Sequence, residues 1–299
     1  MRFVKFHGYG NDYIVFEAAE LRAGGVWPDD RALSGAKCDG FDSFVRRVCE
    51  RHFGAGADGV AVVERLEEET ADFRLRIFNP DGGEAAMSGN GSRCAAAYLY
   101  YRGLWSADEL RFATRAGVKR YRLLERMGPG SYRFEAEIGR PLFDSASVPV
   151  LTGEPLARVL DYPLALAGGE TVRVTALQMC NPNCCVFVDD FAATDWRRLG
   201  SLIEPHAAFP ERTNVEFIRV RDAREIEVRV WERGVGETLS SGTGACAAAV
   251  ASIVGGHTGR RVRVRMPGGL LEVFWREADG EVLLTGTAEV IYGGEWLKN

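Results

Sequence analysis

The sequence predicts an α+β protein of two pseudo-symmetric domains, each a mixed or antiparallel sheet wrapped around a central apolar helix. Three observations lead to this prediction. The stretch that begins at Ser88 returns, one residue shorter, at Ser241, and a glutamate stands four residues before each serine. Each copy runs into an Ala-rich segment with few polar residues, which is typical of a helix surrounded by other structure. Many other segments look like strands, and strand-rich halves with one such helix each are typical of α+β folds.

The amino-acid composition is that of an ordinary folded protein, and the chain is long enough for about two domains. The chain has 299 residues and a net charge of −5, and no basic block stands out. This balance argues against nucleic acid as a partner. The first residues indicate a strand rather than a signal peptide, and the longest apolar run, near residues 245–255, is too short to span a bilayer. We therefore expect a cytoplasmic protein with no membrane partner.

The cysteines indicate neither a disulfide framework nor a metal site. Their number is odd, and no pair has the C-x-x-C spacing of a zinc site. We expect most of them to be buried thiols, and we expect no metal to be bound. The seven are Cys38, Cys49, Cys94, Cys180, Cys184, Cys185 and Cys246.

In the first half, strands are expected at residues 2–6 and 13–17, around a turn rich in glycine, Asn and Asp. Residues 41–53 have a helical pattern. The segment 54–59 that follows is a formal match to the dinucleotide-binding fingerprint, which needs a strand before it and a helix after it. Here a helix precedes it and an apolar, strand-like run follows, so we reject a nucleotide site. Further elements are a strand at 73–78 that stops at a turn over 79–83, the first apolar helix at 92–101, and strands at 109–112 and 118–124.

A glycine- and proline-containing segment at 127–130 is interpreted as a linker, and we place the first domain boundary there. The second half repeats the order of the first. Strands are expected at 171–177, 186–188, 215–220 and 225–231, the second apolar helix at 245–254, and strands at 262–266, 270–275, 282–287 and 289–292.

The repeated motif suggests a pair of anion cradles. A Ser-Gly-x-Gly turn that opens a helix places free backbone N–H groups at the positive end of the helix dipole, where they can hold a carboxylate or a phosphate. If the halves face each other, Ser88 and Ser241 could approach one bound molecule from opposite sides. The structural alternative is that the glycines mark tight turns and let helices pack closely.

A series of segments, in order over nearly the whole chain, resembles the diaminopimelate epimerases, which are cofactor-independent amino-acid epimerases of the lysine and peptidoglycan pathway. The resemblance implies two domains with the substrate between them, a homodimer, and a C-terminal strand that returns to the first domain. The domains would be residues 1–128 plus 287–299, and residues 129–286. The matching segments are Phe6-His7-Gly8-Tyr9-Gly10-Asn11-Asp12-Tyr13, Gly54-Ala55-Gly56-Ala57-Asp58-Gly59, Phe78-Asn79-Pro80-Asp81-Gly82, Met87-Ser88-Gly89-Asn90-Gly91, Asn181-Pro182, Arg212-Thr213-Asn214-Val215-Glu216-Phe217 and Trp231-Glu232-Arg233-Gly234-Val235-Gly236-Glu237-Thr238.

The resemblance also implies a small amino-acid substrate with carboxylates, and no cofactor. Arg233 would pair with the distal carboxylate, because a planar guanidinium donates two parallel hydrogen bonds. Glu232 would serve the reacting amino group. For these two residues alone, a surface ion pair is the structural alternative. The other positions that would hold the substrate are Asn11, Asn79, Asn181 and Asn214, together with Gly89-Asn90-Gly91 and Gly242-Thr243-Gly244 for the α-carboxylate.

The sequence departs from the family at three positions. Ser88 and Ser241 stand where the family has two cysteines that take and return the α-proton, and Asn183 replaces a histidine. A thiol has a reference pKa of about 8.5, whereas a serine hydroxyl has no comparable ionisation. A positioned acid or base typically contributes about 10²- to 10⁴-fold. We therefore expect impaired turnover unless another group, with Glu232 the nearest in sequence, activates the serines.

Three explanations remain open at this point. The chain is a cysteine-to-serine variant of an active epimerase, a natural relative that isomerises another small amino or carboxylic acid, or a non-catalytic binding homologue. Serine hydrolysis is rejected, because the G-x-S-x-G elbow is absent and no histidine lies in a matching segment. Cys180, Cys184 and Cys185 flank Asn181-Pro182 and could bring a substitute thiol near the site, although buried packing is the preferred interpretation.

Overall fold

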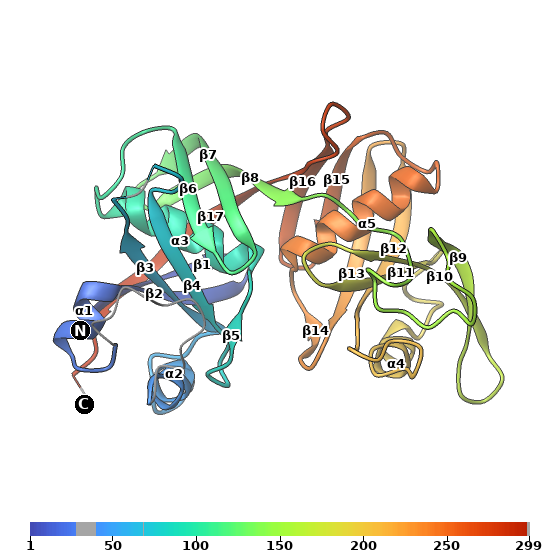
Figure 1. The fold of residues 1–299 in the computed structure, drawn as a ribbon, viewed down its shortest axis with the longest axis horizontal. Helices are drawn as coiled ribbons and strands as arrows, with labels where there is room; N and C mark the ends of the chain where they lie inside the picture. The colour runs from blue at the N-terminus through green and yellow to red at the C-terminus, as the bar shows by residue number, and fades with distance from the viewer. Residues whose placement is uncertain (28–39, 68, 298–299) are drawn as a thin grey trace. The chain divides into compact units, whose positions relative to one another are not determined.

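The computed structural model describes residues 1–27, 40–67 and 69–297. It divides into two compact units: unit 1 is Met1–Ala136 with Gly286–Asn299, and unit 2 is Glu137–Thr285. Each unit is a mixed sheet around one buried helix (Figure 1). This confirms the predicted fold class.

Unit 1 begins with a hairpin in which the strands are joined at Tyr9 and Gly10, both of positive φ. Its strands pair in an order that mixes parallel and antiparallel neighbours: β2 with β3 and β4 with β6 are parallel, whereas the remaining pairs, such as β3 with β4 and β7 with β8, are antiparallel. Its elements are β1 (Arg2–Gly8), β2 (Asn11–Glu17), α1 (Ala18–Ala23), α2 (Phe41–Cys49), β3 (Gly59–Arg65), β4 (Phe73–Phe78), β5 (Glu84–Ala85), α3 (Gly89–Tyr101), β6 (Glu109–Thr114), β7 (Gly117–Gly128) and β8 (Ser131–Gly139).

Unit 2 repeats this topology. The pairs β11–β12 and β13–β15 are parallel, and β12–β13 and β15–β16 are antiparallel, as in the corresponding places of unit 1. Its elements are β9 (Val159–Ala165), β10 (Thr171–Gln178), β11 (Pro182–Phe187), α4 (Trp196–Ile203), β12 (Asn214–Asp222), β13 (Glu225–Glu232), β14 (Gly236–Thr238), α5 (Gly242–Val254), β15 (Arg261–Met266) and β16 (Gly269–Trp275). The last strand, β17 (Val282–Glu295), begins in unit 2 and belongs to unit 1 from Gly286 onward.

The central helices α3 and α5 are buried over nearly their whole length, because each sheet wraps around a helix that is apolar on almost every side. A second helix covers the outer face of each sheet. In unit 1, Phe41 and Phe44 of α2 pack with Phe16 of β2, and in unit 2, Trp196 of α4 packs against Phe217 of β12. The two faces of each sheet therefore have different partners, and the face toward α3 or α5 is the one that meets the repeated motif.

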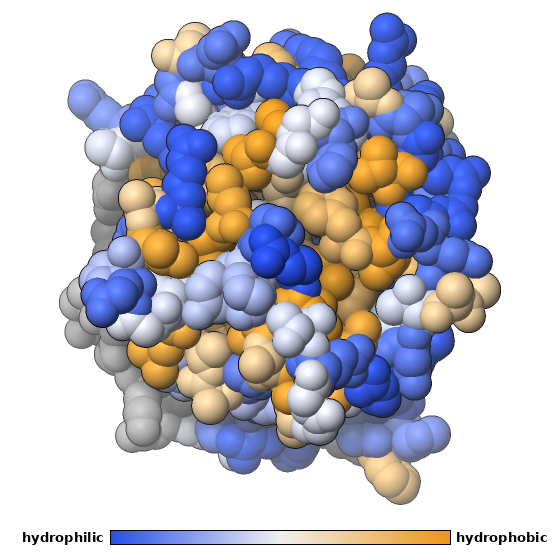
Figure 2. All heavy atoms as spheres, turned by 90° about the vertical axis from the view of Figure 1, so that its right-hand side faces the viewer, coloured by the Kyte–Doolittle hydropathy of each residue, from blue (hydrophilic) through white to orange (hydrophobic). Residues whose placement is uncertain are grey.

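The face of unit 2 shown in Figure 2 carries both apolar and polar side chains. In the space-filling view of Figure 2, apolar side chains gather toward the middle of the face and polar side chains surround them. Folded proteins keep much apolar area in contact with solvent, so this view alone assigns no function. In the part of the chain that the structure describes, no helix is both long enough and apolar enough to cross a membrane.

Several predicted elements differ from the structure in their bounds. Both central helices begin three residues earlier than predicted, at Gly89 and Gly242. The segment 127–130, interpreted as a linker, is the turn of a hairpin in which Gly128 pairs with Ser131. The two strands expected at 282–287 and 289–292 are one strand, β17, whose first residues pair with β16 and whose last residues pair with β1. The sequence analysis did not predict α1, α4, β5, β8, β9 or β14.

Candidate active site

The two repeated motifs have the same local geometry. Ser88 and Ser241 are the N-cap residues of α3 and α5, with φ of −135° and −132°. The Ser88 Oγ accepts a hydrogen bond from the Gly91 backbone N at 3.1 Å, and the Ser241 Oγ accepts one from the Gly244 N at 3.2 Å. Capping by these hydroxyls is why each helix begins at the glycine after the serine. Each serine hydroxyl thus stands at the positive end of a helix dipole.

In unit 1, Ser88 has a second hydroxyl beside it. The Tyr13 Oη lies 2.9 Å from the Ser88 Oγ, and Tyr13 is almost fully buried. Two glycines leave room for this ring: a Cβ at Gly59 would stand 2.5 Å from a Tyr13 ring carbon, and a Cβ at Gly91 would stand 2.8 Å from the same carbon. The sequence placed Tyr13 in a predicted strand and in a segment that resembles the family, but it assigned Tyr13 no role in the site, because nothing in a linear pattern connects it to Ser88.

Two of the predicted substrate-holding asparagines meet in unit 1. The Asn90 Nδ2 donates to the Asn11 Oδ1 at 3.1 Å, and the Asn11 Nδ2 donates to the Asp58 Oδ2 at 3.0 Å. The buried guanidinium of Arg93 donates to the Asn90 Oδ1. These bonds fix the orientation of both amides. Asn79 is exposed in the turn between β4 and β5, and its backbone closes that turn with Gly82 and Gly83.

The acidic residue beside Asn11 belongs to an ion-pair network. Asp12 forms a 2.7 Å ion pair with Lys5 and a further pair with Arg51, which also contacts Asp58. Burial works to raise the pKa of Asp12, but the hydrogen bonds from Arg51 and Lys5 outweigh it and lower this pKa. Asp12 is therefore held as a carboxylate that anchors the start of β2, and it is not suited to act as a general acid.

In unit 2, the strand registers place the polar residues on the face of the sheet that meets α5. Asn183 of β11 pairs with Asn214 of β12, and Glu216 pairs with Val230 of β13. Because side chains alternate along a strand, Asn183, Asn214, Glu216 and Glu232 share one face. The intervening residues point to the opposite face and pack in the core around α4.

Three asparagines form a connected row on this face. The Asn183 Nδ2 donates to the Asn181 backbone O at 2.6 Å and to the Asn181 Oδ1 at 3.0 Å, and the Asn214 Nδ2 reaches the Asn183 Oδ1 at 3.5 Å. The Asn214 Oδ1 accepts from the Arg233 backbone N at 2.9 Å. The structure thus brings Asn181, Asn214 and the Arg233 backbone together, with the fully buried Asn183 as the link.

The two charged residues predicted for the site, Glu232 and Arg233, adjoin this row. The Thr238 Oγ1 donates to the Glu232 Oε1 at 2.6 Å. The exposed Arg233 guanidinium donates to the Glu211 backbone O at 2.9 Å. Glu232 thus accepts a hydrogen bond from β14, whereas the Arg233 guanidinium binds a backbone carbonyl of the loop before β12.

A further carboxyl group, missed by the sequence analysis, lies beside the Ser241 turn. Glu216 is fully buried, and among the described residues its Oε1 has no hydrogen-bond partner. A Cβ at Gly244 would stand 3.0 Å from this Oε1 and 3.1 Å from the Ser241 Oγ. Burial raises the pKa of Glu216 well above its ordinary value, and the charge of Glu232 raises it further. The folded protein therefore favours the protonated form of this group.

The cysteines offer no ready substitute base. Cys184 and Cys185 are buried, and burial is the main reason that the pKa of both thiols is raised. Cys180 is exposed, and its Sγ contacts the Ile138 backbone O at 3.3 Å. Cys38 lies outside the described residues. Over residues 1–27, 40–67 and 69–297, no group of three or more His, Cys, Asp or Glu side chains is placed to hold a metal ion.

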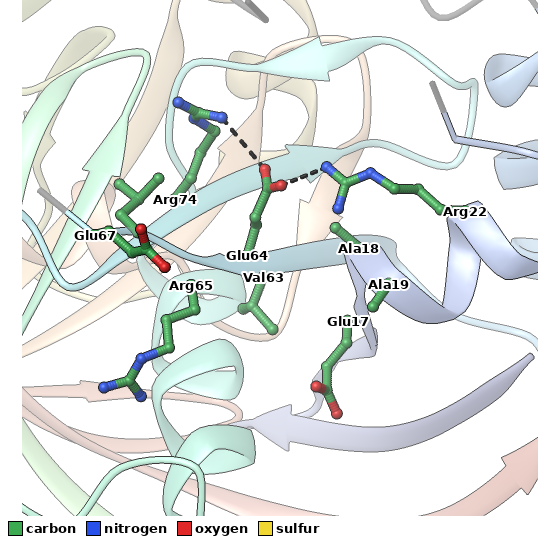
Figure 3. Close-up of a pocket in the computed structure, with 10 residues that line it drawn as sticks. Glu17, Ala18, Ala19, Arg22, Val63, Glu64, Arg65, Glu67 and Arg74 are labelled. Atoms are coloured by element: carbon green, nitrogen blue, oxygen red, sulfur yellow. Dashed lines mark hydrogen bonds and ion pairs between the residues drawn. The ribbon is translucent and has the colours of Figure 1, made fainter. Parts of the chain in front are cut away.

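One hollow on unit 1 is separate from the predicted site residues. It has a volume of about 590 Å³, and none of the described residues that line it is a predicted site residue. Figure 3 shows the Glu64 carboxylate between Arg22 and Arg74, which both pair with it. Arg65, which also lines the hollow, donates to the Leu104 backbone O at 3.3 Å. Because two of its basic groups are already matched by a carboxylate, we do not take this hollow as the candidate active site.

Comparisons with known proteins agree on one family. The model of a family described as "Diaminopimelate epimerase" matches residues 3–132 and 175–291. A diaminopimelate epimerase of Pelotomaculum thermopropionicum is 44% identical over 297 residues, which is 99% of both chains. One of Desulforudis audaxviator is 41% identical over 300 residues and the full length of both chains.

Among solved structures the likeness is one of fold. A hydroxyproline epimerase from Agrobacterium vitis, determined with bound trans-4-hydroxy-L-proline, has a TM-score of 0.70 at 17% identity, covering 98% of this chain and 90% of its own. A probable proline racemase from Agrobacterium radiobacter has a TM-score of 0.69 at 17% identity, covering 100% of this chain and 93% of its own.

Proposed function

Because the chain belongs to the diaminopimelate epimerase family, we propose that it is a cofactor-independent isomerase that binds L,L- or meso-diaminopimelate and moves the proton of its α-carbon. The observation that carries this proposal is the pair of matching helix N-termini, each capped by a serine at a cysteine position of the family. As the resemblance implies, the protein acts as a homodimer in the supply of lysine and peptidoglycan precursors, and, as expected from the sequence, it acts in the cytoplasm.

The proposal assigns the substrate's charged groups to named partners. The backbone N–H groups of Gly89-Asn90-Gly91 and Gly242-Thr243-Gly244 take the α-carboxylate, and Arg233 takes the distal carboxylate. Glu232 takes an amino group. Asn11, Asn79, Asn181 and Asn214 complete the binding set. The hydrogen bonds that orient Asn11, Asn90, Asn181 and Asn214 support this assignment, because they preorganise the amides before a ligand arrives.

In the proposed reaction, Ser88 and Ser241 are the two groups that exchange the proton of the α-carbon. A serine hydroxyl is a much weaker base than a thiolate. This protein therefore turns over its substrate more slowly than a family member with cysteines at these positions. The occupation of both cysteine positions by serine also supports one alternative function, that of a protein that binds the amino acid without changing it.

The experiment that tests the proposal measures solvent deuterium incorporation at the α-carbon of both diaminopimelate stereoisomers by proton NMR, with a parallel calorimetric titration of binding. We expect saturable binding and exchange above a protein-free control. Saturable binding without exchange would favour the binding protein. The absence of both would overturn the proposal.

A further inference from the structure

The Ser88 hydroxyl is hydrogen-bonded to a phenol, whereas the corresponding strand position in unit 2 holds an amide. Tyr13 of β2 pairs with Gly59 of β3, and Asn183 of β11 pairs with Asn214 of β12, so Tyr13 and Asn183 occupy equivalent registers of the repeated topology. The Asn183 amide bonds to Asn181 and Asn214. A phenol can gain or lose a proton in water and an amide cannot, so the two half-sites are chemically unequal.

We propose that Tyr13 is the proton-exchanging partner of Ser88, so that the α-proton of the substrate passes through the Ser88 hydroxyl to and from the Tyr13 phenol. This inference rests on the proposed function and deepens it, because it supplies an acid–base group where the family's thiol is missing. Ser88 is the group that touches the substrate, and Tyr13 acts through it.

The hydrogen bonds around the Ser88 hydroxyl are compatible with proton transfer through it. A serine oxygen can accept two hydrogen bonds and donate one. The Gly91 N–H occupies one acceptor position at 3.1 Å, and Tyr13 lies at 2.9 Å as donor or acceptor. When Tyr13 donates, the proton of Ser88 is free to point toward the substrate. When Tyr13 is a phenolate, Ser88 donates to it, and the Ser88 oxygen presents a lone pair to the substrate instead. These two arrangements, with the phenol and with the phenolate, are the states after and before transfer of the α-proton.

The proton transfer needs no reactant other than the substrate, Ser88 and Tyr13. In the abstraction step, the substrate C–H bond breaks and leaves its electron pair on carbon. Its proton goes to the Ser88 oxygen, whose own proton goes to the Tyr13 phenolate. In the return step, the Ser88 O–H bond breaks, a C–H bond forms with the carbanion's electron pair, and Ser88 takes the phenol proton, so that the phenolate is restored.

The chemistry of the groups explains why the phenol matters. The reference pKa is about 10 for tyrosine and about 8.5 for cysteine, so a phenol is the nearer of the two hydroxyls to a thiol in acidity. Gly59 and Gly91 hold open the space for the Tyr13 ring, since a Cβ at either would collide with it. The contact is therefore built into two strands and a helix, and it does not depend on a mobile surface side chain.

The test uses four proteins: the parent chain, Tyr13→Phe, Ser88→Cys, and the double variant that combines them. Each is assayed for deuterium incorporation into diaminopimelate from about pH 6 to about pH 10.5, a range that brackets thiol and phenol titration. In the parent, we expect exchange to rise toward alkaline pH. Tyr13→Phe should remove this rise and lower exchange by about 10²-fold. In the Ser88→Cys background the same change should cost less than about threefold, because the thiol ionises by itself.

Controls separate a relay from a structural role. Tyr100→Phe removes the hydroxyl of another buried tyrosine of unit 1, one that donates to the Ala107 backbone O, and should leave the pH profile unchanged. An equal loss from Tyr13→Phe in both backgrounds would mean a merely structural Tyr13 and would overturn the inference. If Tyr13→Phe does not fold, the pH dependence of deuterium incorporation by the parent protein is the test. Incorporation that rises at alkaline pH supports proton transfer to Tyr13, and incorporation that does not change with pH overturns it.

The Ser88→Cys/Ser241→Cys variant separates failure of this inference from failure of the proposed function. Exchange by that variant, together with none by the parent at any pH, would overturn the Tyr13 relay and leave the proposed function standing. No exchange by either folded protein would overturn both.

Discussion

The Tyr13 Oη and the Ser88 Oγ lie 2.9 Å apart, although one residue belongs to the second strand and the other caps the third helix. Gly91, in the first turn of that helix, is one of the two glycines whose small size leaves room for the Tyr13 ring. The same glycine donates its backbone N–H to the Ser88 Oγ. Gly91 therefore affects both the packing of Tyr13 and the hydrogen bonding of the Ser88 hydroxyl.

Gly91→Ala should therefore destabilise the protein. The added Cβ would stand 2.8 Å from a carbon of the Tyr13 ring, which is itself buried. We expect the free energy of unfolding to fall by about 1–3 kcal/mol, measured by urea denaturation. Gly128→Ala is the matched control, because no described atom lies within 4 Å of a Cβ there. Equal stability of the two variants would contradict the packing described for Tyr13.

Glu216→Gln should change how stability depends on pH. The pKa of the buried carboxyl is raised in the folded protein above its ordinary value of 4.5. The folded state then binds its proton more tightly than the unfolded state does, so the parent loses stability as pH rises above 4.5 until the folded pKa is passed. Glutamine does not titrate. We expect the variant to gain on the parent by about 1.4 kcal/mol per pH unit in that window, measured by urea unfolding.

The exposed Glu277→Gln, with a side chain 82% accessible, is the control for loss of one carboxyl. A difference between Glu216→Gln and the parent that stays constant with pH would show that Glu216 does not hold its proton more tightly in the folded state.

Arg233→Gln should weaken ligand binding without unfolding the protein. The guanidinium is exposed, so its removal costs little folding energy, whereas a charge-assisted pair with a carboxylate is worth about 1.5–3 kcal/mol. We expect the Kd for diaminopimelate to rise by about 10- to 100-fold in calorimetric titration. Arg173→Gln, which removes an exposed arginine paired with Asp161, should leave the Kd unchanged. Unchanged affinity in Arg233→Gln would remove Arg233 from the binding set.

Asn183→Ala should destabilise unit 2. Its amide links Asn181 to Asn214 in a fully buried position, and its loss leaves buried polar groups of both neighbours without that partner. We expect a loss of about 1–3 kcal/mol in the free energy of unfolding. The exposed Ser201→Ala on α4 should change it by less than about 0.5 kcal/mol. If both variants unfold alike, the asparagine row contributes nothing to stability.

Much of the fold could be predicted from the sequence because its signals are local. The repeated motif predicted the duplication, and β4 was predicted at its observed bounds because its residues alternate and a strong turn follows. The helix starts were placed three residues late, since the glycines that follow Ser88 and Ser241 were taken as turn residues. Strand β9 was missed because its proline and exposed polar residues hide the alternation.

The residues of the candidate site that lie close together in sequence could be predicted, whereas those brought together only by folding could not. Ser88 and Ser241 could be found from spacing alone, because the helix cap and its glycines are contiguous in sequence. Tyr13 beside Ser88, and Glu216 beside the Gly244 turn, could not be found, since each contact joins a strand to a helix far along the chain. Such contacts depend on strand register, which no linear motif records.

The most direct test of the central claim is the rate at which Ser88→Cys/Ser241→Cys interconverts L,L- and meso-diaminopimelate. The claim is that this chain keeps a diaminopimelate site in which two serines occupy the positions of the two acid–base groups. It predicts a rate about 10²-fold or more above that of the parent, because each thiol restores an ionisable group at a helix N-terminus. Ser201→Cys, on exposed α4, should give no such increase. A folded double variant with no more interconversion than the parent would contradict the claim.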